Sequence, residues 1–133
     1  MDDGPPLTAL DIAVTGEKYT WHVRYPGPDR QLDTPDDVED MRNLHVPADV
    51  DITLHLNSRD LIYSFAVPAV GVRKMAVPDV PFTARFKATA TGRFPLLGDQ
   101  LCGYTHPSLL GTLIVLPPDR FLAWQRGERD PEP

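Results

Sequence analysis

Proline and glycine break this chain into short pieces. Fifteen prolines and nine glycines are spread over 133 residues and separate short apolar runs from one another. Proline interrupts helices because it lacks a backbone N–H, and glycine and proline together mark turns. Several of the runs alternate apolar and polar residues, as strands with one buried face do. The sequence therefore predicts an all-β sandwich with many turns, folded as a single domain over residues 1–133.

Six segments carry the pattern of strands. They are residues 10–14, 18–25, 50–56, 61–67, 82–91 and 111–115. The acidic, proline-rich segment 26–43 is predicted to be a long loop. After Pro118, the spacing of Phe121 and Trp124 predicts a short terminal helix that packs both rings on one side.

Charge and composition limit the function. The net charge of −6 argues against nucleic acid as a partner and is compatible with docking to a basic protein. The acidic run at 33–40 is either such a docking patch or a solvated loop. A single cysteine excludes an internal disulfide. No apolar run approaches the roughly 20 residues of a membrane span, and no signal peptide is predicted.

Two segments carry a pattern of metal ligands at a familiar spacing. Upstream the chain reads NSRDLIYSFAVPAVGVRKMAVPD, and downstream it reads LLGDQLCGYTHPSLLGTLIVLPP. Together they resemble the soluble domain of subunit II of haem-copper respiratory oxidases, which carries the dinuclear copper centre called CuA. In that family a His follows the strand after the SRD-type turn, and a C-x-E-x-C-x-x-x-H-x-x-M loop supplies the other ligands. The resemblance spans nearly the whole chain and implies a cupredoxin-like Greek-key β-sandwich with a short C-terminal helix.

The family's ligand positions can be carried over without a gap. In the order His, Cys, Glu, Cys, His, Met they fall on Tyr63, Gly98, Gln100, Cys102, His106 and Leu109. Only Cys102 and His106 keep the family's side-chain ligands. Gly98 offers no bridging thiolate, Leu109 has no thioether, and Tyr63 carries a phenol of pKa about 10, a poor copper ligand. The resemblance therefore implies that the dinuclear CuA centre has been lost and that no cofactor is bound.

A single copper ion at Cys102 and His106 is the alternative, with Tyr63 as a further ligand. A blue-copper site needs a second histidine, and the spare candidates are His22, His45 and His55. In the simpler interpretation, Cys102 is a small buried residue and His106 a hydrogen-bonding loop residue. A third hypothesis is a copper-delivery or sensing domain that binds copper(I) reversibly at Cys102 and His106.

Three further positions follow from the resemblance. Trp21 and Tyr19 occupy the aromatic segment that aids electron entry and faces the membrane subunit in the family. Gln100 replaces a carboxylate that holds magnesium at the subunit interface. Tyr63 either fills the space left by copper, with its hydroxyl bonded to His106 or to a loop carbonyl, or is a redox-active tyrosine beside Trp21.

The predicted function is that of an accessory subunit II-like domain, without catalysis of its own, that supports docking or assembly. Its expected partner is the integral membrane haem-copper oxidase subunit I, with a basic cytochrome c as a second partner, on the periplasmic face of a bacterial membrane. The lack of spans before the domain implies an excised soluble piece or a separately encoded domain. The alternative is an electron-transfer cupredoxin with one unconventional copper. Substituting Tyr63→His, Gly98→Cys and Leu109→Met together is expected to restore a purple dinuclear centre.

Overall fold

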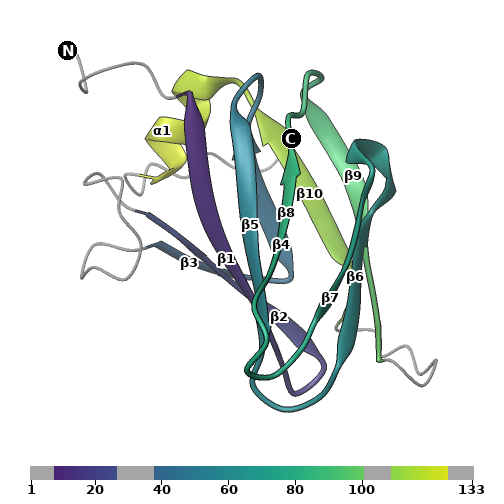
Figure 1. The fold of residues 1–133 in the computed structure, drawn as a ribbon. Coiled ribbons are helices and arrows are strands. Elements are labelled where there is room, and N and C mark those ends of the chain that lie inside the picture. The colour runs from purple at the N-terminus through teal and green to yellow at the C-terminus, as the bar shows by residue number, and fades with distance from the viewer. Residues whose placement is uncertain (1–7, 27–37, 101–108, 126–133) are drawn as a thin grey trace.

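The computed structural model describes residues 8–26, 38–100 and 109–125. Within these residues the chain forms two five-stranded sheets that pack face to face, with one short helix near the C-terminal end (Figure 1). The predicted all-β sandwich with a terminal helix is confirmed.

The first sheet has the order β3-β2-β1-β5-β8. Its strands are β1 (Ala9–Glu17), β2 (Thr20–Tyr25), β3 (Val38–Met41), β5 (Asp51–Ser58) and β8 (Phe82–Phe86). The β1–β5 pair is parallel, and the other neighbours are antiparallel.

The second sheet has the order β4-β10-β9-β6-β7. Its strands are β4 (Asn43–Pro47), β6 (Tyr63–Val67), β7 (Val72–Ala76), β9 (Gly92–Gln100) and β10 (Gly111–Leu116). The β4–β10 pair is parallel. A 3-10 turn, η1 (Pro68–Val70), joins β6 to β7 and ends at Gly71 in the left-handed conformation.

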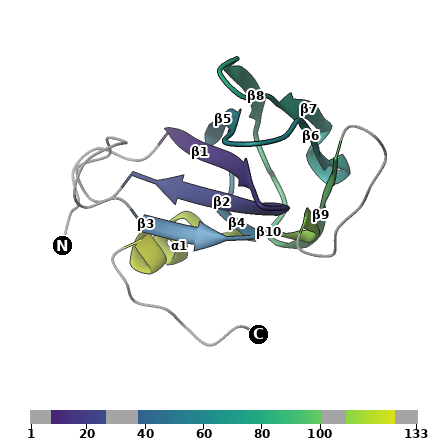
Figure 2. The ribbon, with the colours of Figure 1, turned by 90° about the horizontal axis from the view of Figure 1, so that it is seen from below.

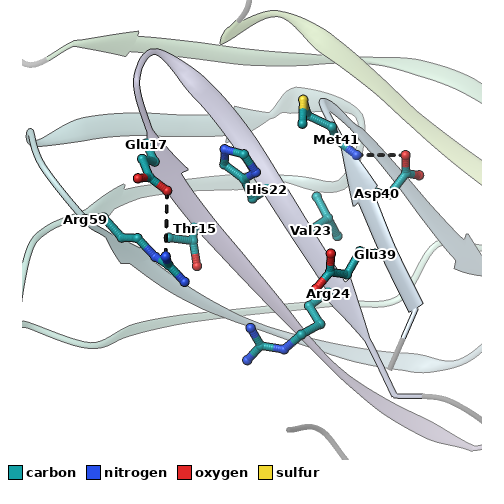
Figure 3. A pocket seen from close by; sticks show the side chains of 9 residues that line it. All are labelled: Thr15, Glu17, His22, Val23, Arg24, Glu39, Asp40, Met41 and Arg59. Atoms are coloured by element: carbon teal, nitrogen blue, oxygen red, sulfur yellow. Dashed lines mark hydrogen bonds and ion pairs between the residues drawn. The ribbon is translucent and has the colours of Figure 1, made fainter. Parts of the chain in front are cut away.

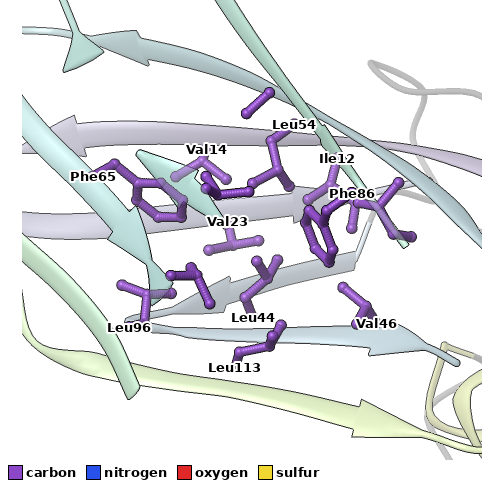
Figure 4. Packing of buried hydrophobic residues seen from close by; sticks show 14 of the residues in the cluster. Ile12, Val14, Val23, Leu44, Val46, Leu54, Phe65, Phe86, Leu96 and Leu113 are labelled. Atoms are coloured by element: carbon purple, nitrogen blue, oxygen red, sulfur yellow. The ribbon is translucent and has the colours of Figure 1, made fainter. Parts of the chain in front are cut away.

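The core lies between the sheets because alternate residues of each strand point inward. Ile12 and Val14 of β1 and Val23 of β2 meet Leu44 and Leu113 of the opposite sheet (Figure 4). All five are buried. Burial of such aliphatic side chains stabilises the fold by about 1.5–3 kcal/mol each.

The helix α1 (Pro118–Gln125) begins with a proline, which is well suited to the first turn. It buries Phe121 and Trp124 and packs against β4 and β10. Figure 1 shows α1 at the end of the sandwich opposite the β1–β2 turn, and in the view of Figure 2 the helix overlaps β3. The predicted helix and its two packing residues are confirmed.

Several predicted boundaries were wrong. The strand predicted at 18–25 begins at Thr20 because Lys18 and Tyr19 form a turn, and the one predicted at 82–91 ends at Phe86. Part of the predicted loop 26–43 is the edge strand β3, while residues 27–37 lie outside the described residues. Strands β4, β7 and β9 were also not predicted.

Candidate functional site

The β1–β2 turn has an unusual backbone. Lys18 has φ of 53° and Tyr19 has φ of 62°, so two successive non-glycine residues are left-handed between the paired residues Glu17 and Thr20. Two-residue hairpin turns of this kind favour asparagine and glycine, because other side chains are strained there. Both central N–H groups are held by side chains. The Lys18 N–H donates to Asp60 Oδ2 at 2.8 Å, and the Tyr19 N–H donates to the Tyr63 hydroxyl at 3.2 Å.

The acceptors come from the β5–β6 connection, which is itself tightly hydrogen-bonded. The Ser58 hydroxyl donates to the Leu61 carbonyl and accepts from the Asp60 N–H at 3.2 Å. The Leu61 N–H donates to Asp60 Oδ1 at 2.7 Å. The Arg59 N–H donates to the Gly16 carbonyl at 2.9 Å, which ties this connection to the end of β1. Asp60 is thereby fixed beneath the β1–β2 turn.

Tyr63 is fully buried, and its hydroxyl donates to Asp60 Oδ1 at 2.7 Å. Burial raises the pKa of Tyr63 to about 12; the hydrogen bond from the Tyr19 N–H opposes this, and the Asp60 carboxylate adds to it. Loss of hydration alone would raise the pKa of Asp60. The hydrogen bonds from the Lys18 N–H, the Tyr63 hydroxyl and the Leu61 N–H outweigh burial and lower that pKa. At neutral pH the pair is therefore a phenol bonded to a carboxylate.

Trp21 lies beside Tyr63 and is fully buried. Its ring contacts Tyr63 and Phe65 edge to face, with centroid separations of 5.6 and 5.1 Å. The indole Nε1–H donates to the carbonyl oxygen of Leu109 at 3.0 Å. This hydrogen bond joins β2 to the backbone just before β10.

Two glycines make room for these rings. A Cβ at Gly16 would lie 2.5 Å from a Tyr63 ring carbon, and a Cβ at Gly98 would lie 2.7 Å from Trp21 Nε1 and 2.9 Å from the Leu109 oxygen. Distances below 3.0 Å are not tolerated without a shift of the neighbours. The indole of Trp21 therefore fills the space into which a side chain at position 98 would extend.

The structure brings three of the six carried-over positions together. Tyr63, Gly98 and Leu109 all contact Trp21. The backbone of Gln100 pairs with Tyr63 in the β6–β9 ladder. Cys102 and His106 lie outside the described residues.

The aromatic positions differ in exposure. Trp21 has no exposed surface, so its ring is a core residue and does not itself form a docking surface. Tyr19 is partly buried and packs edge to face on Tyr63, at a centroid separation of 6.4 Å. Of the expected interface pair, only Tyr19 reaches the surface in this structure.

The hydroxyl of Tyr63 has other partners than those expected. We expected His106 or a loop carbonyl, whereas in the described part of the chain the partners are the Asp60 carboxylate and the Tyr19 N–H. Asp60 was not singled out from the sequence. Its signal was the Ser-x-Asp pattern of the β5–β6 turn, which is typical of a hydrogen-bonded turn.

The spare histidines are engaged elsewhere. His45 is buried, stacks on Trp124 at 4.3 Å and bonds to Asp40 at 2.8 Å. His55 bonds to Asp11 at 3.0 Å on the exposed face of the first sheet. His22 points away from the core into a shallow groove of about 470 Å³ (Figure 3).

That groove lies on the outer face of β1, β2 and β3. Glu17 and Arg59 approach to 3.9 Å across one end of it, and Asp40 lies at the other (Figure 3). Its lining carries both signs of charge, and no group of three or more His, Cys, Asp or Glu residues able to hold a metal occurs among the described residues. The groove is therefore a polar surface, and its described lining residues do not form a metal-binding group.

The residues present do not fit a dinuclear copper centre. Such a centre needs two bridging thiolates, and the chain has one cysteine. Gly98 supplies no ligand, and the Trp21 ring and the Leu109 carbonyl leave no room there for a longer side chain. Leu109 is fully buried as an apolar residue.

None of the helices in the described residues is long and apolar enough to cross a membrane. Solved structures share the architecture. The periplasmic domain of subunit II of cytochrome oxidase of Bradyrhizobium japonicum superimposes with a TM-score of 0.72 at 28% identity, covering 90% of this chain and 92% of that one.

Sequence comparison agrees with the structural one. A cytochrome c oxidase subunit 2 of Thermostichus vulcanus is 37% identical over 117 residues, 88% of this chain and 33% of the relative. An alternative cytochrome c oxidase subunit 2 of Bradyrhizobium diazoefficiens is 25% identical over 90% of this chain and 51% of the relative. The chain thus spans between a third and about half of these relatives. The family model for the periplasmic domain of cytochrome c oxidase subunit II matches residues 11–115, and the chain belongs to that family.

Proposed function

We propose that this chain is a subunit II-type domain that no longer carries a dinuclear copper centre and acts in docking or assembly of a haem-copper oxidase. The observation that carries the proposal is the loss of ligand side chains at the carried-over positions. The chain has one cysteine, whereas a dinuclear centre needs two bridging thiolates, and Gly98 and Leu109 offer no sulfur. Trp21 packs beside Gly98 and donates its indole N–H to the Leu109 carbonyl, which holds β2 against the second sheet.

Exposed apolar residues beside this cluster support a docking role. Met41, Leu97 and Leu110, which we call the apolar rim, are 53%, 39% and 40% exposed. Leu110 follows the buried Leu109, and its carbonyl accepts a hydrogen bond from Nε of Arg42, the residue after Met41, at 3.2 Å. Leu97 lies next to the β9–β10 pair Leu96 and Gly111. Exposed apolar groups of this size, when gathered, favour protein contact.

The proposed partner is the integral membrane subunit of a haem-copper oxidase, subunit I, on the periplasmic side of a bacterial membrane. Family membership supports this choice, because relatives are named as subunits of such oxidases. A basic cytochrome c is a second proposed partner, for which the acidic residues Glu39 and Asp40 of β3 provide complementary charge. Electrons would enter the oxidase without passing through a copper centre in this domain.

Co-purification tests the docking role. The affinity-tagged chain would be produced together with the membrane subunit, in wild-type form and as Met41→Asp with Leu110→Asp. A matched control, Thr89→Asp, places a charge on an exposed residue in the β8–β9 connection at the other end of the sandwich. The proposal predicts loss of the membrane subunit only from the double variant. Equal recovery with all three proteins would contradict it.

A further inference from the structure

Tyr63 combines burial with a defined proton acceptor. The ring has no exposed surface, whereas Asp60 is exposed. The hydroxyl donates to Asp60 Oδ1 at 2.7 Å, a short hydrogen bond to a charged group. The phenolic proton can therefore pass to a carboxylate that is in contact with water, while the ring stays in the core.

Aromatic rings connect Tyr63 to its surroundings in two directions. Trp21 packs on it at 5.6 Å and 64°, and Tyr19 packs on it at 6.4 Å and 86°. Tyr19 is partly exposed and Trp21 is fully buried, so the three rings run from the surface into the core. The hydrogen bond from Trp21 Nε1 to the Leu109 carbonyl fixes the indole at the buried end of this series.

A second buried tyrosine provides an internal comparison. Tyr25 is also fully buried, and it packs on Trp124 at 4.9 Å. Its hydroxyl accepts from the His45 N–H at 2.8 Å and donates to the Asn43 carbonyl at 3.4 Å. A backbone carbonyl cannot keep the proton of a phenol, whereas a carboxylate can.

We propose that Tyr63 is a one-electron redox site of this domain, with Asp60 as its proton acceptor and Trp21 and Tyr19 as neighbouring relays. A strong one-electron oxidant, of the metal-oxo or peroxide-derived radical class, removes one electron from the cluster. The Tyr63 O–H bond breaks, its proton moves to Asp60 Oδ1, and the electron goes to the oxidant. The products are a neutral phenoxyl radical and a carboxylic acid. A one-electron donor reverses the step, and the proton returns from Asp60.

The proposal does not depend on the docking role. Docking rests on the apolar rim, and oxidation rests on the Tyr63–Asp60 pair, so each can fail while the other holds. The raised pKa of Tyr63, about 12, means that the phenol keeps its proton until it is oxidised. Oxidation and proton transfer must therefore occur together.

Flash photolysis with a ruthenium photo-oxidant and an irreversible quencher tests the proposal on the full chain. The thiol of Cys102 is alkylated in all samples so that it cannot reduce a radical. The readouts are the near-ultraviolet absorption of a phenoxyl radical and its electron paramagnetic resonance spectrum. Wild type and the matched control Tyr25→Phe should give the same signal, and Tyr63→Phe should lose most of it.

Asp60→Asn separates the redox role from a structural one. The amide leaves the ring in place but cannot take up the proton, so the radical yield should fall and its lifetime should shorten. If Tyr63→Phe does not fold, the radical yield and lifetime of Asp60→Asn test the proposal without it. A wild-type signal in Tyr63→Phe, loss of the signal in Tyr25→Phe, or an unchanged yield and lifetime in Asp60→Asn would each overturn the proposal.

Discussion

Strand β2 carries an aromatic cluster at each end, and the two clusters differ in how they are built. The site-end cluster consists of Tyr19, Trp21, Tyr63 and Phe65, and the helix-end cluster consists of Tyr25, His45, Phe121 and Trp124. Both are largely buried and packed edge to face or stacked. Two of the helix-end residues, Phe121 and Trp124, belong to α1, which packs against β4 and β10.

The site-end cluster depends on features that the helix-end cluster does not use. Lys18 and Tyr19 are left-handed without being glycine, and Gly16 and Gly98 have no room for a Cβ. A carboxylate from another connection holds the turn. Departures from local rules of this kind concentrate at functional sites. The comparison shows that backbone strain and close packing on glycine are concentrated at the site end, although the chain lacks the ligands for a dinuclear copper site.

The largest expected effect comes from removing the central ring. Trp21→Ala should reduce the free energy of unfolding by about 3–5 kcal/mol, because a fully buried indole is replaced by a cavity. Trp124→Ala is the matched change at the helix end. Chemical denaturation measures both losses, and amide exchange at Lys18 and Tyr19 should accelerate only in Trp21→Ala. Equal acceleration in the two variants, or a loss below about 1 kcal/mol for Trp21→Ala, would show that the site-end cluster is not a separate core.

Adding one carbon at position 98 should have the next largest effect. Gly98→Ala should cost about 1–3 kcal/mol, because the new Cβ meets the indole and a backbone oxygen. In the Trp21→Phe background the penalty should shrink, since the Phe ring lacks the atoms that the Cβ approaches. A double-mutant cycle measures this coupling. Purely additive losses would argue against the close packing of Trp21 on Gly98.

The hydroxyls of Tyr63 and Tyr25 should contribute differently to the free energy of unfolding. Tyr63→Phe removes a hydrogen bond to a carboxylate and leaves the Tyr19 N–H without that acceptor, so it should cost about 1.5–3 kcal/mol. Tyr25→Phe removes bonds to backbone groups and should cost about 1 kcal/mol. Thermal and urea unfolding of both variants provide the measurement. A larger loss of stability in Tyr25→Phe than in Tyr63→Phe would contradict the proposed difference between the two clusters.

The smallest effect is expected in alkaline solution. The pKa of Tyr63 is raised to about 12 from 10.0, so the folded protein holds this proton more tightly than the unfolded chain. The resulting stability is present below pH 10 and is lost as the pH rises toward 12. Phenolate absorption should show an ionisation near pH 12 in the wild type that is absent from Tyr63→Phe. Identical titration curves of the two proteins above pH 10 would contradict the buried pair.

Regular elements could be predicted from the sequence because their pattern is local. Alternating apolar and polar residues were sufficient to predict β1 and β5, and the spacing of Phe121 and Trp124 was sufficient to predict α1. Strand β9 was missed because Pro95 and Gly98 interrupt its pattern, and β3 was missed because an exposed edge strand can be as acidic as a loop.

The site was predictable only in part. The family resemblance placed Tyr63, Gly98 and Leu109 together, and the structure does the same. The bond between Asp60 and Tyr63, and the position of the indole beside Gly98, depend on tertiary packing and have no local signature. Restoration of a dinuclear centre by Tyr63→His, Gly98→Cys and Leu109→Met stays a prediction. The Cβ that Gly98→Cys adds would require the Trp21 ring to shift.

Copper titration tests the central claim most directly. Copper(II) would be added to the purified chain and to a Cys102→Ser control, with visible absorption and metal analysis after removal of excess metal. The missing ligands predict no stoichiometric copper and the same colourless spectrum for both proteins. A strong band in the wild type that disappears in Cys102→Ser, with one or two coppers retained per chain, would contradict the claim that this domain has lost its copper centre.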